Sequence, residues 1–311
     1  MAENKNTKPT RNHMNEHIKT AQNRADTVME LRRQREDDEW GELLMVAQSL
    51  LVCGLPYRKT DERQITMRAK LAGDSVSVTF TCCLDGVSMP YGSDRTLLHW
   101  LVDRAIRSEK PYVSWDTATE FLKDAGMSDA GKNFKDLRER FRRISGVAIS
   151  IVREREGREK TLIVPIVEES TLPSSVDIKS EKRGLRRILG EDFGFTLNAR
   201  FWKEIREHHI PVPWQLIRLT RKQSQLQDHI LFLYWRSYAA KNPSLIPWTG
   251  IEDQAAGDDS NPRRIKFRYK AALRAIRAID PAFPGEILDQ GIQVQPYQGF
   301  LKSGENLKRL K

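Results

Sequence analysis

The sequence has few of the residues that build disulfide or metal sites. Its 311 residues include three cysteines, Cys53, Cys82 and Cys83, and six histidines. Three cysteines are too few for a disulfide framework, and no pair of them has the Cys-x-x-Cys spacing that is typical of zinc sites. The histidines are scattered without the spacing of metal ligands. We therefore expect a reduced protein with no metal, no cofactor and no catalytic metal chemistry.

Long apolar runs are also missing. No stretch of the chain approaches the ~20 apolar residues that cross a bilayer. The amino terminus is polar and charged, rich in Asn, Lys and Thr, and does not have the pattern of a signal peptide. These absences favour a cytoplasmic protein without a membrane partner.

Positive charge is in excess. The 52 Lys and Arg residues outnumber the 42 Asp and Glu residues, which leaves a net charge of +10. A basic surface raises the local concentration of phosphates, so the composition favours a polyanionic partner such as nucleic acid. A merely soluble basic protein would have the same charge, and composition alone does not separate the two. The chain is long enough for two domains of ordinary size.

The same order of expected elements occurs twice along the chain. The first set is an apolar helix at 96–107, a strand at 112–115, a small helix at 116–125, a basic helix at 132–143 and a strand pair around 156–157. The second set is a helix at 225–240, a strand at 245–248, a short helix at 249–256, a very basic helix at 261–279 and an extended segment at 286–298. This is the order of a winged helix-turn-helix. We predict a helix-rich α+β fold with two tandem winged-helix domains, although the two halves are not alike in sequence.

Breaker residues suggest where these domains divide. Ser170, Pro173, Ser174 and Ser175 form a turn-rich cluster that is followed by a charged stretch. We place a polar amino-terminal arm and helix at 1–55, the first domain at 56–170, a linker at 171–190 and the second domain at 191–311. Helical spacing extends from Ile18 to an apolar end at 40–51. A β-hairpin is expected at 64–83, a strand at 193–197 and a helix at 199–208.

The basic helix of the second half is the strongest candidate for DNA contact. Its cations are Arg263, Arg264, Lys266, Lys270, Arg274 and Arg277. At about 100° per residue all of these except Arg264 fall within roughly 80° of one another, opposite Ile265, Tyr269 and Ile276. No acid occurs between Pro262 and Ile279, whereas a merely solvated helix usually mixes both signs of charge. Arg and Lys in a major groove can bond guanine and hold phosphates. Ser260 or Asn261 can cap this helix, and Pro262 suits its first turn.

The first half carries a more dilute set of cations. Lys132, Lys135, Arg138 and Arg142 share one face of the helix at 132–143, where Asp136 and Glu139 also lie. The connector at 153–159 carries Arg153, Arg155 and Arg158, as expected of a wing that touches the DNA backbone. We expect this set to contact a neighbouring half-site or a second protomer of a homodimer.

Two segments resemble enzyme motifs, but each lacks a feature that its motif requires. The segment Gly126–Asn133 nearly spells a phosphate-binding loop, but Asn133 stands where Ser or Thr is needed, and a helix is expected where a strand should precede. His208 and His209 are adjacent, so they do not form the His-hydrophobic-His metal pair of rolling-circle nucleases. We therefore expect no enzymatic activity and no catalytic residues, and we rank a nicking enzyme or an ATPase below a DNA-binding protein.

Residues 88–144 resemble the plasmid-encoded RepA replication-initiator family. The resemblance rests on the segment Met89-Pro90-Tyr91-Gly92-Ser93-Asp94-Arg95, on the leucine-rich helix that follows, and on the Ser114–Gly126 and Leu137–Ile144 segments. Met89 replaces the usual leucine. The element order of the remainder is similar to that of tandem winged-helix initiators of the TrfA kind. The resemblance implies binding to repeated double-stranded origin DNA, local duplex opening and recruitment of host replication initiation proteins and helicase. A DNA-binding transcriptional repressor, acting on its own gene, stays open as the alternative.

Overall fold

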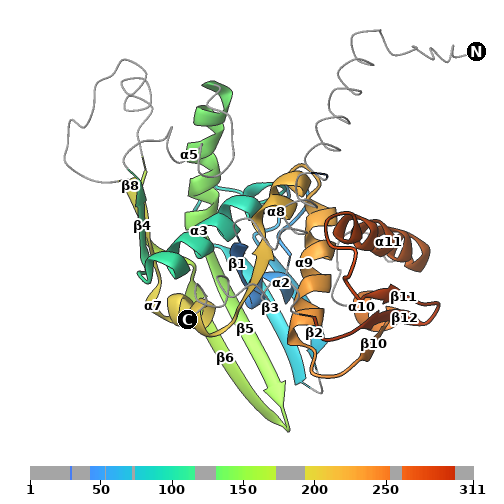
Figure 1. Cartoon of the computed structure of the whole chain (residues 1–311). Coiled ribbons are helices and arrows are strands. Elements are labelled where there is room, and N and C mark those ends of the chain that lie inside the picture. Colours follow the sequence, from blue (N-terminus) through green and yellow to red (C-terminus); the bar gives the residue numbers. More distant parts are fainter. Residues whose placement is uncertain are drawn as a thin grey trace, which may run out of the picture.

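The computed structural model describes residues 29, 43–52, 54–71, 74–115, 131–172, 193–252 and 261–297, and these form a mixed α/β fold (Figure 1). The helices are α2 (Gln48–Val52), α3 (Asp94–Ser108), α5 (Gly131–Ser145), α7 (Ala199–Glu207), α8 (Trp214–Thr220), α9 (Ser224–Ala239), α10 (Trp248–Glu252) and α11 (Pro262–Ile279). The strands are β1 (Leu43–Ala47), β2 (Gln64–Leu71), β3 (Asp74–Cys82), β4 (Tyr112–Trp115), β5 (Val147–Arg155), β6 (Arg158–Pro165), β7 (Val167–Thr171), β8 (Phe193–Leu197), β9 (His209–Pro213), β10 (Ser244–Pro247), β11 (Glu286–Ile287) and β12 (Gly291–Val294).

The largest sheet has the antiparallel order β2-β3-β5-β6. Val76, Val78 and Phe80 of β3 alternate toward the core and are buried, as the period of two in a strand requires. Strands β5 and β6 are joined by Glu156 and Gly157, both of which have positive φ angles (51° and 73°). Two consecutive positive φ angles are those of a tight hairpin turn that matches the twist of the strands, and they favour glycine. Both hairpins expected from the sequence are thus confirmed in their strands, although residues 72 and 73 lie outside the described part.

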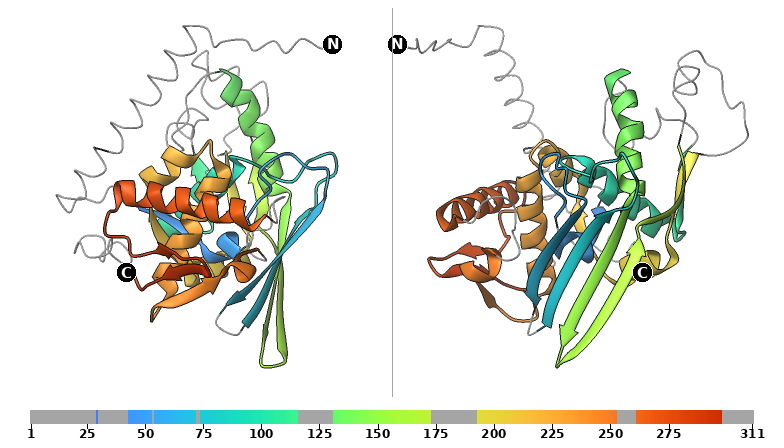
Figure 2. Two further views of the ribbon diagram at one scale, coloured as in Figure 1. Left: turned by 90° about the vertical axis from the view of Figure 1, so that its right-hand side faces the viewer. Right: turned by 180° about the vertical axis from the view of Figure 1, so that it is seen from behind.

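Two buried helices, α3 and α9, form the centre of the molecule. The first three turns of α3 are almost entirely buried, and α9 is buried from His229 to Trp235. Helix α9 packs against α11, α2 and α8 and so joins the amino-terminal and carboxy-terminal parts of the chain. Figure 2 shows α11 on the surface beside α9, with strands β10 to β12 beneath it.

The prediction that the amino-terminal helix continues through its apolar end is wrong at residues 43–47. These residues form β1, which pairs with β9 from Leu43 opposite Pro213 to Ala47 opposite His209. All five side chains of β1 are buried, and Met45 donates its backbone N–H to Asp103 Oδ1 at 2.7 Å. A short run that is apolar on every side has no periodicity, so the pairing with distant β9 decides its conformation.

The strand pairing differs between the two halves. In the second half β10 pairs with β12, and β12 pairs with β11. In the first half β4 pairs with β8, which pairs in turn with β7, and the β5–β6 hairpin joins β3 instead. The expected order of elements is confirmed where it is described, whereas 116–125 and 253–256 lie outside the described residues. The domain boundaries stay a prediction, and β8 lies beyond the predicted linker yet pairs with strands that precede it.

Gly291 makes the small carboxy-terminal sheet possible. A Cβ atom at this position would lie 2.1 Å from the carbonyl oxygen of Ile246, far inside contact distance. Only glycine therefore lets β10 and β12 approach this closely.

Of the helices in the described ranges, none combines the length and the apolar character needed to cross a membrane.

Candidate nucleic-acid interface

Helix α11 begins and packs as its sequence indicates. The side chain of Asn261 accepts a hydrogen bond from the backbone N–H of Arg263 at 3.0 Å, and Pro262 occupies the first turn. This confirms Asn261 as the cap, which satisfies one of the free N–H groups at the start of the helix. On the opposite side Ile265, Tyr269 and Ile276 are buried against α9, where the ring of Tyr269 stacks on His229 at 4.4 Å.

The outer face of α11 is cationic over its full length. Arg263, Arg264, Lys270, Arg274 and Arg277 are exposed, and Lys266 is partly buried. The helix has 18 residues and is therefore about 27 Å long. Five of the six cations predicted from the sequence, all except Arg264, thus share one long surface, together with the partial positive charge of the helix amino terminus.

Two of these cations also have structural roles. Lys266 Nζ of α11 forms an ion pair at 2.6 Å with Oδ1 of Asp289, which lies in the turn between β11 and β12. Trp248 Nε1 donates to the carbonyl oxygen of Asp289 at 2.8 Å and holds this turn beside the helix. Lys266 also lowers the pKa of the exposed Asp289 carboxyl through this hydrogen bond and its charge. An acidic group therefore lies at the edge of the cationic surface.

Arg277 supports the end of the helix. Its Nε donates to the carbonyl oxygen of Phe283 at 3.3 Å and its Nη2 donates to that of Gly285 at 2.6 Å. These bonds fasten the segment that leads from α11 to β11. Arg277 therefore shapes the loop beside the surface as well as adding charge to it.

Phe267, a residue that was not predicted as part of the site, lies on the cationic face and is 66% exposed. It follows Arg263 by one turn and precedes Lys270 by another, so its helical position, rather than its residue type, could have identified it.

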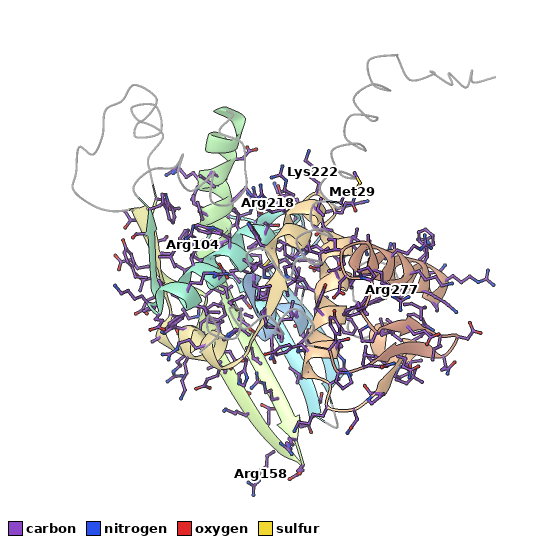
Figure 3. The ribbon with its side chains drawn as sticks, in the orientation of Figure 1. Met29, Arg104, Arg158, Arg218, Lys222 and Arg277 are labelled. Carbon is purple, nitrogen blue, oxygen red and sulfur yellow. The ribbon has the colours of Figure 1, made fainter. Side chains whose placement is uncertain are left out.

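Two further exposed cations, Arg218 and Lys222, lie at the end of α8 and in the turn after it. Figure 3 shows both on the upper side of the molecule, between Arg104 and the part of α11 that carries Arg277.

The cations of the first half are less available. The side chains of Lys132 and Lys135 lie outside the described part, Arg138 and Arg142 are partly buried, and Arg142 lies 3.6 Å from Glu139. Arg153 donates to Glu204 of α7 at 2.6 Å, which ties the hairpin to that helix. Arg155 and Arg158 are exposed near the hairpin tip, where Glu154, Glu156 and Glu159 offset their charge.

The structure does not bring this basic helix and the hairpin tip together. Helix α5 has 15 residues and rises from one end of the large sheet, while the β5–β6 hairpin extends nine residues in the other direction (Figure 1). The start of α5 and the tip at Arg158 are therefore about 50 Å apart. The first-half residues expected to contact DNA do not form one surface.

The segment that carries the family resemblance has a structural role in this fold. Asp94 is buried at the start of α3 and accepts hydrogen bonds from Arg140 Nε and Arg143 Nε of α5, both at 2.7 Å. Arg143 also lies over the ring of Tyr91, and Gly92 has a φ angle of 55° in the turn before the helix. Buried charges require such partners. The Tyr-Gly-Ser-Asp part of the motif therefore fastens α3 to α5.

Arg95, the next residue, connects the two halves of the chain. It is buried, donates to the carbonyl oxygen of Leu55, and forms a 3.2 Å ion pair with Asp228 of α9. Burial raises the pKa of the Asp228 carboxyl to about 6, although Arg95 and a hydrogen bond from Tyr57 oppose this effect. Burial, aided by the charge of Arg95, lowers the pKa of neighbouring His99 to about 3.

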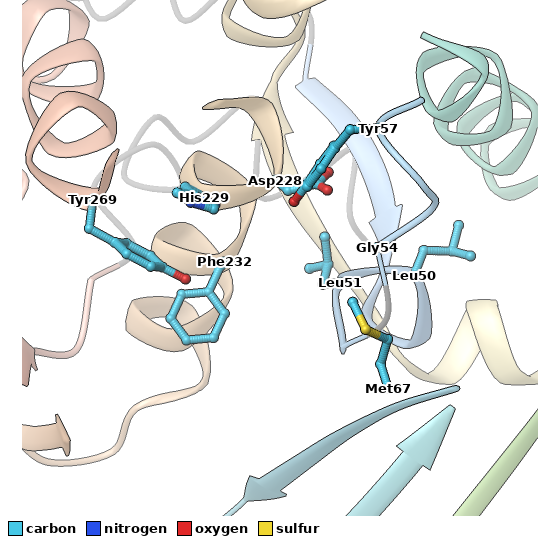
Figure 4. Close-up of a pocket in the computed structure, with 9 residues that line it drawn as sticks. All are labelled: Leu50, Leu51, Gly54, Tyr57, Met67, Asp228, His229, Phe232 and Tyr269. Atoms are coloured by element: carbon cyan, nitrogen blue, oxygen red, sulfur yellow. The ribbon is translucent and has the colours of Figure 1, made fainter. Parts of the chain in front are cut away.

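A small cavity adjoins this ion pair (Figure 4). It is lined by Leu50, Leu51, Gly54, Tyr57, Met67, Asp228, His229, Phe232 and Tyr269, and its volume of about 30 Å³ has room for about one water molecule. A cavity of this size is too small for a nucleotide or cofactor. No group of three or more His, Cys, Asp or Glu side chains in the described ranges is arranged to hold a metal ion.

No protein-family model and no curated protein matches this chain. Two solved structures that contain domains 2 and 3 of RctB are similar to it at 12% sequence identity. One has a TM-score of 0.44 and covers 78% of this chain and 87% of its own. The other has a TM-score of 0.45 and covers 73% of this chain and 83% of its own.

Proposed function

We propose that this protein binds duplex DNA through α11, as part of a winged-helix unit to which residues 224–252 and 261–297 belong. The observation that carries the proposal is the exposed cationic face of α11, with no acid along 18 residues. The sheet order β10-β12-β11 and the succession α9, β10, α10, α11, β11, β12 support this proposal, because a winged helix has the same order of helices and strands. In that arrangement the last helix enters the major groove and the β11–β12 turn lies beside it.

The dimensions of α11 suit this docking. Arg263, Lys270 and Arg274 are exposed along one line of the helix, and the first and last are about 17 Å apart. A major groove about 12 Å wide admits one helix, and cations along that helix reach base edges and the phosphates on both sides. Each neutralised phosphate releases counterions, so we expect affinity to fall steeply with salt.

We propose further that the protein is a replication initiator of the plasmid RepA type. Support comes from the resemblance at residues 89–101, where Asp94 fastens α3 to α5 and Arg95 joins α3 to α9 of the second half. An initiator must bend or unstack DNA beside its site, at a cost of several kcal/mol. The buried Arg95–Asp228 ion pair joins the first half of the fold to α9, the helix that packs on α11, and this connection supports a protein that sustains such strain. Host replication proteins would be its partners, and the protein would act in the cytoplasm without catalytic chemistry of its own.

The first experiment is selection of duplex DNA from a random library by the full chain, followed by mobility-shift titration at several salt concentrations. We expect a defined site and a log–log salt slope steeper than about −3. A shallower slope, or no selected sequence, would contradict docking of α11 in a groove. Purified protein should also show no DNA-stimulated ATP turnover.

A second experiment separates an initiator from a repressor. The protein, supplied in trans, should let a plasmid that carries only the cognate origin persist in a suitable host. It should also make A·T-rich bases beside the bound site reactive to permanganate. Specific binding without either effect, in the presence of host initiation proteins, would favour the repressor.

A further inference from the structure

One large apolar side chain is out of place on the cationic surface of α11. Phe267 is 66% exposed, whereas Tyr269, two residues later, is only 2% exposed. Single exposed apolar residues are common and need no explanation by themselves. Phe267 differs because its neighbours three and four residues away along the helix include the exposed cations Arg263, Arg264 and Lys270.

The surroundings of Phe267 leave room for a close approach. At about 100° per residue it lies roughly 40° from Arg263, and Ala271 lies another 40° further round. Both Ala271 and Ala278 are partly exposed on this side of the helix. An aromatic ring beside small side chains, bordered by cations, is an apolar strip inside a phosphate-binding surface.

We propose that Phe267 contacts the C5-methyl group of a thymine in the major groove and makes α11 specific for thymine at one position. This inference rests on the proposed docking of α11 on DNA. Thymine alone presents a methyl group in the major groove, and apolar side chains read it by direct contact. The flanking cations hold phosphates and supply affinity, while the ring supplies discrimination between bases.

A protein partner fits this surface less well. An interface that buried Phe267 would also have to desolvate the cations around it, and each would need a buried acid in return. Duplex DNA provides an apolar methyl group in the groove and phosphates at both edges, so it matches both features at once. DNA is therefore the occupant that the charge pattern favours.

The test removes one methyl group from the DNA and the ring from the protein. Each thymine of the selected site is replaced in turn by deoxyuridine, which differs only in lacking the C5-methyl. The unsubstituted protein should lose about fourfold in affinity at one position, the effect of one methyl group. Phe267→Ala should bind the original site more weakly and should be insensitive to deoxyuridine at that position alone.

Control variants separate the outcomes. Phe267→Leu should keep part of the sensitivity, and Ile163→Ala, which removes a side chain that is 67% exposed on β6, should leave it unchanged. If Phe267→Ala keeps the full deoxyuridine profile, the methyl contact is refuted while DNA binding by α11 stands. If Phe267→Ala binds DNA normally but loses self-association, the residue is a protein contact and the inference is overturned. If no duplex site is selected at all, the proposed function itself fails.

Discussion

The most direct consequence of the structure concerns two exposed cations in the middle of α11. Lys270 and Arg274 are separated by one helical turn on the outer face, and neither contributes to the buried face that packs on α9. Replacing both by alanine keeps the helix, because alanine has the highest helix propensity. The double variant Lys270→Ala/Arg274→Ala should therefore fold normally and lose DNA affinity.

The size of the loss follows from counterion release. Each phosphate contact contributes about 0.9 to the log–log salt slope, so two lost contacts should make the slope shallower by about 1.8. Over a fourfold rise in salt, from roughly 50 to 200 mM, the unsubstituted protein should lose about tenfold more affinity than the double variant. Should one of the pair reach a base edge, a further loss of roughly 1–3 kcal/mol would appear at that base pair alone.

The assay is a mobility-shift titration of the selected site at four or five salt concentrations, with thermal unfolding as a check on folding. The matched control is Lys110→Ala/Lys203→Ala, which removes the same net charge from exposed positions after α3 and on α7, on the other side of the fold from α11. The control should keep nearly the full slope. Equal slopes for the two double variants would show that overall charge, and not α11, determines binding, and would refute the assignment of this helix.

Three other predictions follow from buried or misplaced charges. Asp94→Ala should lower the free energy of unfolding by about 3–5 kcal/mol in urea denaturation, because two guanidinium groups lose their buried partner; a loss below 1 kcal/mol would contradict the clamp between α3 and α5. Burial lowers the pKa of His99 and of His229 from 6.5 to about 3, so their stabilisation is complete above pH 6.5 and is lost as the pH falls toward 3. At pH 5 the two neutral histidines should lower the free energy of unfolding by about 4 kcal/mol, and protonation of Asp228, whose pKa is raised to about 6, should restore about 1 kcal/mol of it. Unfolding titrations at pH 7 and pH 5 should show this net loss. Equal stability at both pH values would argue against neutral buried histidines. Asp289→Asn should tighten DNA binding at low salt, since it removes an acid from the edge of the cationic surface, and unchanged or weaker binding in the same mobility-shift titration would place that turn away from the DNA.

Several elements could be predicted from the sequence because their signals are local. Helix α11 has a capping residue, a proline in its first turn and an apolar face at helical spacing, and each of these acts within a few residues. The Glu156-Gly157 turn likewise depends on the conformational freedom of glycine at one position. The cationic face of α11 was predicted correctly for the same reason, since helical periodicity alone determines which side chains share a face.

Tertiary contacts determined the strand pairings and side-chain contacts that local sequence patterns cannot predict. Residues 43–47 are apolar without periodicity, and only the pairing with β9, more than 160 residues later, makes them a strand. The pairing of β4 with β8, and not with the β5–β6 hairpin, is likewise a long-range choice. The sequence alone determined where α11 starts and which cations line it. Only the packed structure, by bringing distant groups within a few ångströms, decided that Lys266 and Arg277 bind parts of their own chain while Phe267 is exposed.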